Sequence, residues 1–153
     1  RRTREFISNM GDVVTHHEKL PNDQVMSLLS SSHYLLFPTF QDTFGYVVLE
    51  SMASGCVPVV SKTRVFPEII QSGENGFLID VPTDSSGDAH RTATTSEEKQ
   101  KLTQRLETTI KELIEIAPND WLRLSSSCRA HIKEHHNPER HRESLLAIYQ
   151  SGL

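Results

Sequence analysis

The sequence predicts an α/β fold, with a parallel sheet that carries helices on both faces. In the first half of the 153 residues, short apolar runs alternate with amphipathic helical patterns, an order typical of strand-helix units. The runs at 34–37 and 57–60 are continuously apolar, as in strands buried on both faces. The second half contains helical stripes, so we expect a helical C-terminal tail.

Four short strands are expected. They cover Asp12–His16, Tyr34–Phe37, Val57–Val60 and Phe77–Ile79. Pro38 stops the second strand, and Pro58 stands near the start of the third, where a missing donor is tolerated. In such a sheet the loops at the carboxyl ends of the strands lead into helix N-termini, and ligands bind there.

Six helices are expected between and after these strands. The first opens at Pro21–Asp23 and runs to about Ser30, and the next three cover Gly45–Ser54, Pro67–Gln71 and Ser96–Ile116. The fifth starts at Pro118–Asp120 and the sixth at Asn137–Glu139. Asn22 or Asp23 is expected to cap the first helix, and Gly55 to follow the second as its C′ residue. The polar stretch 82–95 is interpreted as a surface loop.

Composition narrows the class of protein. The net charge of -4 gives no support for nucleic-acid binding, which favours a basic excess, and no apolar run approaches the roughly 20 residues that span a bilayer. Two cysteines cannot build a disulfide framework, so a reducing cytoplasm is the expected location. The chain starts without Met or an apolar signal region, and we expect a piece of a longer protein.

The most informative segment is Pro38–Glu50, where a buried strand ends and a polar loop enters a helix. The first amides of a helix lack internal partners and carry partial positive charge, so they suit a diphosphate. Gly45 would let a ligand approach the backbone closely. Asp42 and Glu50, separated by seven residues, would flank this site, and a carboxylate there suits the paired hydroxyls of a ribose or a sugar.

This segment resembles the Glu-x7-Glu signature of retaining glycosyltransferases with the two-Rossmann-domain GT-B fold (family 4-like, group 1). The matching stretches are Pro38-Thr39, Asp42-Thr43-Phe44-Gly45, Glu50-Ser51-Met52-Ala53-Ser54-Gly55-Cys56-Val57-Pro58-Val59-Val60 and Pro67-Glu68-Ile69-Ile70-Gln71-Ser72-Gly73-Glu74-Asn75-Gly76-Phe77-Leu78. The closing helices, with Asn137-Pro138-Glu139, are also similar to the family's. The resemblance therefore covers nearly the whole chain.

The resemblance implies a role for each matching residue. Asp42 would be the catalytic-site acid that faces the donor sugar, and Glu50 would hold the ribose. The backbone of the loop and helix start would contact the sugar and phosphates, through Thr43, Phe44, Gly45 and Tyr46. Chemistry would need no metal or other cofactor, because backbone dipoles and cations stabilise the leaving diphosphate.

Three features depart from the family pattern. The first acid is Asp42 and not Glu, which shortens its reach by one methylene. The usual Gly-Gly pair before Pro-Glu is missing from the loop Ser61–Phe66, where Lys62 and Arg64 are candidate phosphate contacts but are more often solvated charges. The family's Arg/Lys pair that grips the diphosphate is expected upstream of residue 1.

Other residues have plainer interpretations. Glu68 is either a ligand residue or a first-turn acid favoured by the helix dipole. The histidines His16, His17, His135, His136 and His141 suggest a metal site, but ligands must converge with a second shell, and we predict none. Cys56 is expected to be a small core residue and not a nucleophile.

The chain is therefore predicted to be the donor-binding domain of a hexosyltransferase-type enzyme, over 1–153, without its first strand-helix unit. Its partners would be a nucleotide-sugar donor and a saccharide, lipid or protein acceptor bound by an N-terminal domain outside this chain, through which any membrane association would also occur. Alone, the chain is expected to be inactive. The alternatives are a degenerate, non-catalytic nucleotide-sugar-binding module and a related GT-B epimerase, which the Asp42–Glu50 pattern disfavours.

Overall fold

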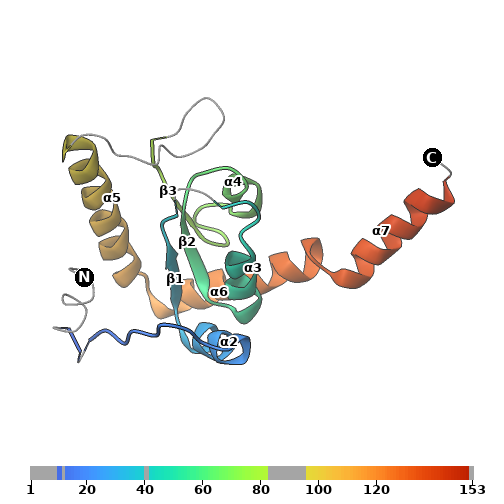
Figure 1. The fold of residues 1–153 in the computed structure, drawn as a ribbon, viewed down its shortest axis with the longest axis horizontal. Coiled ribbons are helices and arrows are strands. Elements are labelled where there is room, and N and C mark those ends of the chain that lie inside the picture. Colours follow the sequence, from blue (N-terminus) through green and yellow to red (C-terminus); the bar gives the residue numbers. More distant parts are fainter. Residues whose placement is uncertain (1–9, 12, 40–41, 83–95, 152–153) are drawn as a thin grey trace.

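Residues 10–11, 13–39, 42–82 and 96–151 are described by the computed structural model (Figure 1). The elements follow in the order α2 (Asn22–Ser31), β1 (Tyr34–Phe37), α3 (Tyr46–Ser54), β2 (Val57–Ser61), α4 (Phe66–Ile69), β3 (Phe77–Ile79), α5 (Ser96–Ile114), α6 (Pro118–His135) and α7 (Pro138–Gln150). Strands and helices alternate over the first half, as the sequence predicts.

The three strands form one parallel sheet in the order β1-β2-β3. The central strand β2 is buried along its whole length, which agrees with the apolar sequence of Val57–Val60. Pro58 lies buried inside this strand, opposite Leu35 in the register. It lacks an N–H, but the residue before it supplies one: the Val57 amide donates to the His33 carbonyl at 3.0 Å. The predicted parallel α/β class is confirmed.

Helices cover both faces of the sheet. On one face, α3, α4 and α6 build a core around Val48, Met52, Phe66 and Leu124. On the other face, α5 packs Leu113 against Val59 and Ile79. Figure 1 shows α5 alone on its side of the strands, while α6 continues into α7, which projects away from the body of the molecule.

The predicted strand at 12–16 is wrong for the residues described there, 13–16 (Asp12 lies outside the described residues). The amides of Val13 and Val14 both donate to the Met10 carbonyl, at 2.8 and 2.9 Å, so the chain makes a turn. Val13 is 82% exposed. A strand needs a neighbour for its backbone groups, and in the described part of the chain these residues lie beside none.

Helix ends agree with the sequence in part. Gly55 follows α3 in the left-handed conformation, with φ of 80°, and the Asn137 side chain caps α7 by accepting from the Glu139 amide at 2.9 Å. The predicted cap by Asn22 or Asp23 is wrong, because α2 begins at Asn22 and Pro21 holds the N-cap position without a side-chain bond. The loop expected at 82–95 lies almost wholly outside the described residues.

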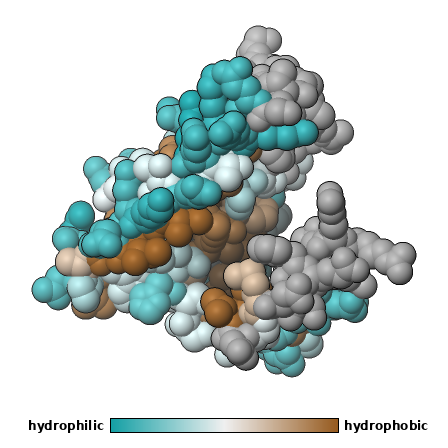
Figure 2. Space-filling model, turned by 90° about the vertical axis from the view of Figure 1, so that its left-hand side faces the viewer, coloured by the Kyte–Doolittle hydropathy of each residue, from teal (hydrophilic) through white to brown (hydrophobic). Residues whose placement is uncertain are grey.

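An apolar band covers the side of the molecule that carries α5 (Figure 2). Exposed apolar side chains on β1 and α5 include Leu36, Ile110 and Ile114.

The outer edge of β1 is unpaired within the described residues, so its backbone groups are open to a further strand. No helix in the described part of the chain has the length and apolar character needed to cross a membrane.

Candidate functional site

The predicted site is built around the amino end of α3, where β1 ends and the loop turns into the helix. Asp42 Oδ1 accepts hydrogen bonds from the Phe44 amide at 3.0 Å and from the Gly45 amide at 2.6 Å. The carboxylate therefore caps the loop and lies against the positive end of the helix. Two of the amides expected to face a ligand have an internal partner in this structure.

The next two amides are placed differently. Within the described residues, the amides of Tyr46 and Val47 donate to no protein acceptor, whereas those of Val48 and Leu49 bond the Gly45 carbonyl inside the helix. Backbone donors at a helix start that lack a protein partner suit an anion. The amino end of α3 thus keeps open donors beside the pair that Asp42 holds.

Gly45 has a structural reason of its own to be glycine. Its φ of 74° lies in the left-handed region, where a Cβ is disfavoured. A Cβ here would also lie 2.6 Å from Cε1 of the Phe66 ring. This contact brings the loop after β2 against the loop after β1, so that both strand ends border one site.

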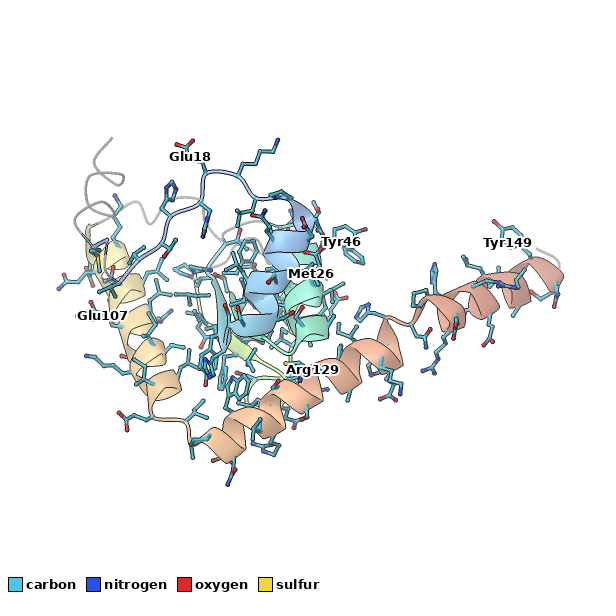
Figure 3. All side chains as sticks on the ribbon, turned by 90° about the horizontal axis from the view of Figure 1, so that it is seen from below. Glu18, Met26, Tyr46, Glu107, Arg129 and Tyr149 are labelled. Carbon is cyan, nitrogen blue, oxygen red and sulfur yellow. The ribbon has the colours of Figure 1, made fainter. Side chains whose placement is uncertain are left out.

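Glu50 lies on the same helix face as Tyr46, one turn further along α3. Its side chain is half-buried, and no described residue pairs with its carboxylate. The rings of Tyr46 and Phe44 lie 4.7 Å apart and are 70% and 45% exposed. Figure 3 shows Tyr46 and Glu107 on opposite sides of the sheet, so this aromatic pair borders the face away from α5.

The loop between β2 and α4 holds the two candidate phosphate contacts. Lys62 Nζ lies 3.6 Å from Asp80, and both side chains are exposed, so this pair contributes little to stability. Arg64 has φ of 42°, the left-handed conformation in a residue with a side chain. The buried Thr63 hydroxyl has no hydrogen-bond partner among the described residues. The loop therefore has a strained backbone at Arg64 and an unsatisfied hydroxyl at Thr63.

The carboxyl end of α3 is held by α6. Ser125 Oγ donates to the Gly55 carbonyl at 2.7 Å, and the Arg129 guanidinium donates to the Ser54 carbonyl at 2.9 Å and to Ser125 at 3.0 Å. A Cβ on Gly55 would collide with that guanidinium. The last carbonyls of α3 thus receive donors from a helix that lies about 70 residues later in the chain.

A polar hollow of about 430 Å³ lies between the end of β3 and α5. Two cations line it, and both have protein partners: Lys101 pairs with Glu97 at 2.7 Å, and Arg105 donates to the Asp80 carbonyl at 2.8 Å. An anion there would compete with these bonds and with the nearby Glu112. The amino end of α3 is the better anion site.

The two cysteines are buried, and several histidines lie together near the end of α6. Burial raises the pKa of the Cys56 thiol to about 11 and that of Cys128 to about 12, so both are protonated at neutral pH and unsuited as nucleophiles. Burial and the neighbouring His135 and His136 lower the pKa of His131. In the described ranges no three His, Cys, Asp or Glu side chains are grouped for a metal ion.

Three contacts at this site carry no local signal in the sequence. Arg129 and Ser125 contact the end of α3 from α6, and Phe66, the first residue of α4, lies against Gly45. The two bonds to Asp42, unlike these contacts, could be expected from the sequence. An Asp side chain often accepts from backbone amides two or three residues ahead of it, near the start of a helix. That these residues contact a ligand stays a prediction.

Comparison with known proteins gives the site its context. The model of the family described as glycosyl transferases group 1 matches residues 8–113, a stretch that includes β1, α3, β2 and α4. Outside this match lie α6 and α7.

Individual relatives agree with the family match at lower coverage. A D-inositol 3-phosphate glycosyltransferase from Arthrobacter sp. (strain FB24) is 30% identical over 48% of this chain and 17% of its own length. An N-acetyl-alpha-D-glucosaminyl L-malate synthase from Bacillus anthracis is 37% identical over 39% of this chain and 16% of its own length. A sucrose synthase from Acidithiobacillus caldus is 32% identical over 72% of this chain and 12% of its own length. The matched part thus spans less than a fifth of each relative.

Proposed function

The chain belongs to the glycosyl transferases group 1 family, and we propose that it binds the nucleoside diphosphate sugar donor of a retaining glycosyltransferase. The observation that carries the proposal is the amino end of α3. There the open amides of Tyr46 and Val47, the Glu50 carboxylate and the Asp42 carboxylate border one helix start. The amides suit the diphosphate and the acids suit hydroxyls.

Each acid is assigned to one part of the donor. Glu50 lies half-buried on the exposed side of α3, where it accepts from the two ribose hydroxyls. Asp42 precedes the helix and faces the sugar. Charge-assisted hydrogen bonds of this kind contribute about 1.5–3 kcal/mol each, so the two contacts of Glu50 would matter for every ligand that carries a ribose.

The remaining parts of the reaction follow from this assignment. Thr43, Phe44 and Gly45 line the sugar and phosphate path, and Lys62 and Arg64 supply cations near the leaving diphosphate. Stabilisation by backbone dipoles and cations would let transfer of a hexose proceed without a metal. The acceptor, a saccharide, lipid or protein, would bind a further domain of the full-length protein, and we place the enzyme in the cytoplasm.

The test is calorimetry on the full-length protein with the diphosphates of uridine, guanosine and adenosine. Glu50→Gln keeps the size of the side chain but weakens both acceptors, so we expect at least about tenfold weaker binding of the accepted diphosphate. Glu107→Gln removes the same charge on α5, on the opposite side of the sheet (Figure 3), and should bind as the wild type does. Equal affinity of Glu50→Gln and wild type would refute the ribose assignment.

A non-catalytic binding module is the second candidate. Two features favour it: Asp42 replaces the family's Glu, and Arg64 stands in a left-handed position in the loop that lacks the family's Gly-Gly pair. Turnover separates the two functions. A full-length protein that binds a nucleotide sugar but neither transfers nor hydrolyses the sugar would support the module.

A further inference from the structure

Asp42 occupies backbone donors that a diphosphate would also need. Its Oδ1 is the acceptor for both the Phe44 and the Gly45 amide, the latter at 2.6 Å. A backbone N–H makes one strong bond at a time, so a phosphate oxygen can reach these amides only when the carboxylate leaves. Two anions also repel each other when they share one helix end.

We propose that Asp42 is a displaceable internal ligand that holds the empty site and is driven onto the sugar by the incoming diphosphate. This inference rests on the proposed function. In the empty protein the carboxylate satisfies the last two amides of the loop, those of Phe44 and Gly45. When the donor binds, its phosphate oxygens take these amides together with those of Tyr46 and Val47, and Asp42 turns to the sugar hydroxyls.

The side-chain length at this position makes the exchange specific to this chain. An Asp reaches the amides two and three residues ahead in a compact local cap, and its carboxylate lies directly against them. A Glu, one methylene longer, fits this cap less well and reaches further outward. The Asp found here therefore binds the amides of its own loop when the site is empty. This competition lowers the affinity for ligands that lack a sugar.

The family resemblance, which assigns Asp42 to the sugar, implies that Asp42→Asn leaves binding of a bare diphosphate almost unchanged. The two hydrogen bonds change that expectation. An Asn side chain keeps a neutral acceptor for the cap but holds the amides more weakly and does not repel phosphate. Removal of the competing carboxylate should therefore strengthen binding of diphosphates.

The experiment is calorimetry on the full-length protein with inorganic pyrophosphate and with the three nucleoside diphosphates. Asp42→Asn should bind them roughly three- to tenfold more tightly than the wild type and should transfer sugar poorly. Asp42→Glu should also bind them more tightly but should retain transfer. Glu107→Gln controls for the loss of one negative charge, and thermal unfolding confirms that each variant is folded.

The outcomes separate this inference from the proposed function. If Glu50→Gln weakens diphosphate binding while Asp42→Asn leaves it unchanged or weakens it, the donor site stands and the displacement is refuted. If the wild type binds neither pyrophosphate nor any of the diphosphates, the proposed function fails and the displacement fails with it. Tighter binding by Asp42→Asn and wild-type binding by Glu107→Gln supports the displacement.

Discussion

At its carboxyl end helix α3 is hydrogen-bonded to α6, whereas at its amino end the amides of Tyr46 and Val47 lack a protein acceptor among the described residues. The last carbonyls receive donors from Ser125 and Arg129, and the helix ends in a left-handed Gly55. At the other end the aromatic rings of Phe44 and Tyr46 are exposed. One end of the same helix is built for stability, and the other keeps groups available to a ligand.

The loop next to the amino end continues this contrast. Thr63 buries a hydroxyl without a partner in the described residues, and Arg64 adopts a left-handed backbone. Features of this kind cost free energy and concentrate at functional sites. Changes at the α6 end should therefore lower stability, whereas changes at the loop end should leave it unchanged or raise it.

The largest effect is expected for Gly55→Ala. Alanine is strained at φ of 80°, and its Cβ would push the Arg129 guanidinium away from Ser54 and Ser125. We expect the free energy of unfolding to fall by about 2–3 kcal/mol, measured by urea denaturation.

Gly73→Ala is the matched control for this change. Gly73 has a similar φ of 83°, but a Cβ there meets nothing within 4 Å, so only the backbone strain of about 1–2 kcal/mol remains. Equal losses for the two variants would show that the contact with Arg129 contributes nothing.

A smaller effect is expected for two buried hydroxyls, that of Ser125 at the carboxyl end of α3 and that of Thr63 in the loop between β2 and α4. Ser125→Ala removes the donor to the Gly55 carbonyl, and leaving that buried carbonyl unpaired should cost about 1–2 kcal/mol. Thr63→Val removes a hydroxyl that has no described partner and should keep or raise the stability, by up to about 1 kcal/mol. A loss at Thr63 as large as that at Ser125 would contradict the contrast between the two ends.

The sequence predicts the parts of this protein that local patterns determine. The apolar runs at 34–37 and 57–60 become β1 and β2, and the spacing of Val48 and Met52 predicts the buried face of α3. Each signal is contained in a few neighbouring residues, and buried parallel strands are continuously apolar because both faces are covered. Motif resemblance adds the family, which the match over 8–113 confirms.

The remaining features depend on distant parts of the chain. Val13 and Val14 have a strand pattern but turn back on Met10, because a ladder needs a partner that these residues lack in the described structure. Arg129 lies 75 residues from the Ser54 carbonyl that it contacts, so no local pattern predicts that bond. The roles of Asp42 and Glu50 toward a donor stay predictions.

The smallest effect, and the most direct measure of strain near the site, is expected at Arg64. Its backbone φ of 42° disfavours any residue with a Cβ. Arg64→Ala removes the side-chain interactions and keeps the strain, whereas Arg64→Gly removes both. The glycine variant should therefore be more stable than the alanine variant by about 0.5–1 kcal/mol, which corresponds to a melting temperature about 1–4 °C higher. At Val65, with φ of -70°, the order should reverse, because glycine gains nothing there and loses more backbone entropy on folding. If Arg64→Gly is no more stable than Arg64→Ala, the loop is unstrained. If it is more stable and the full-length enzyme also loses affinity for its donor, the left-handed Arg64 backbone is part of how the open end of α3 is kept ready for a ligand.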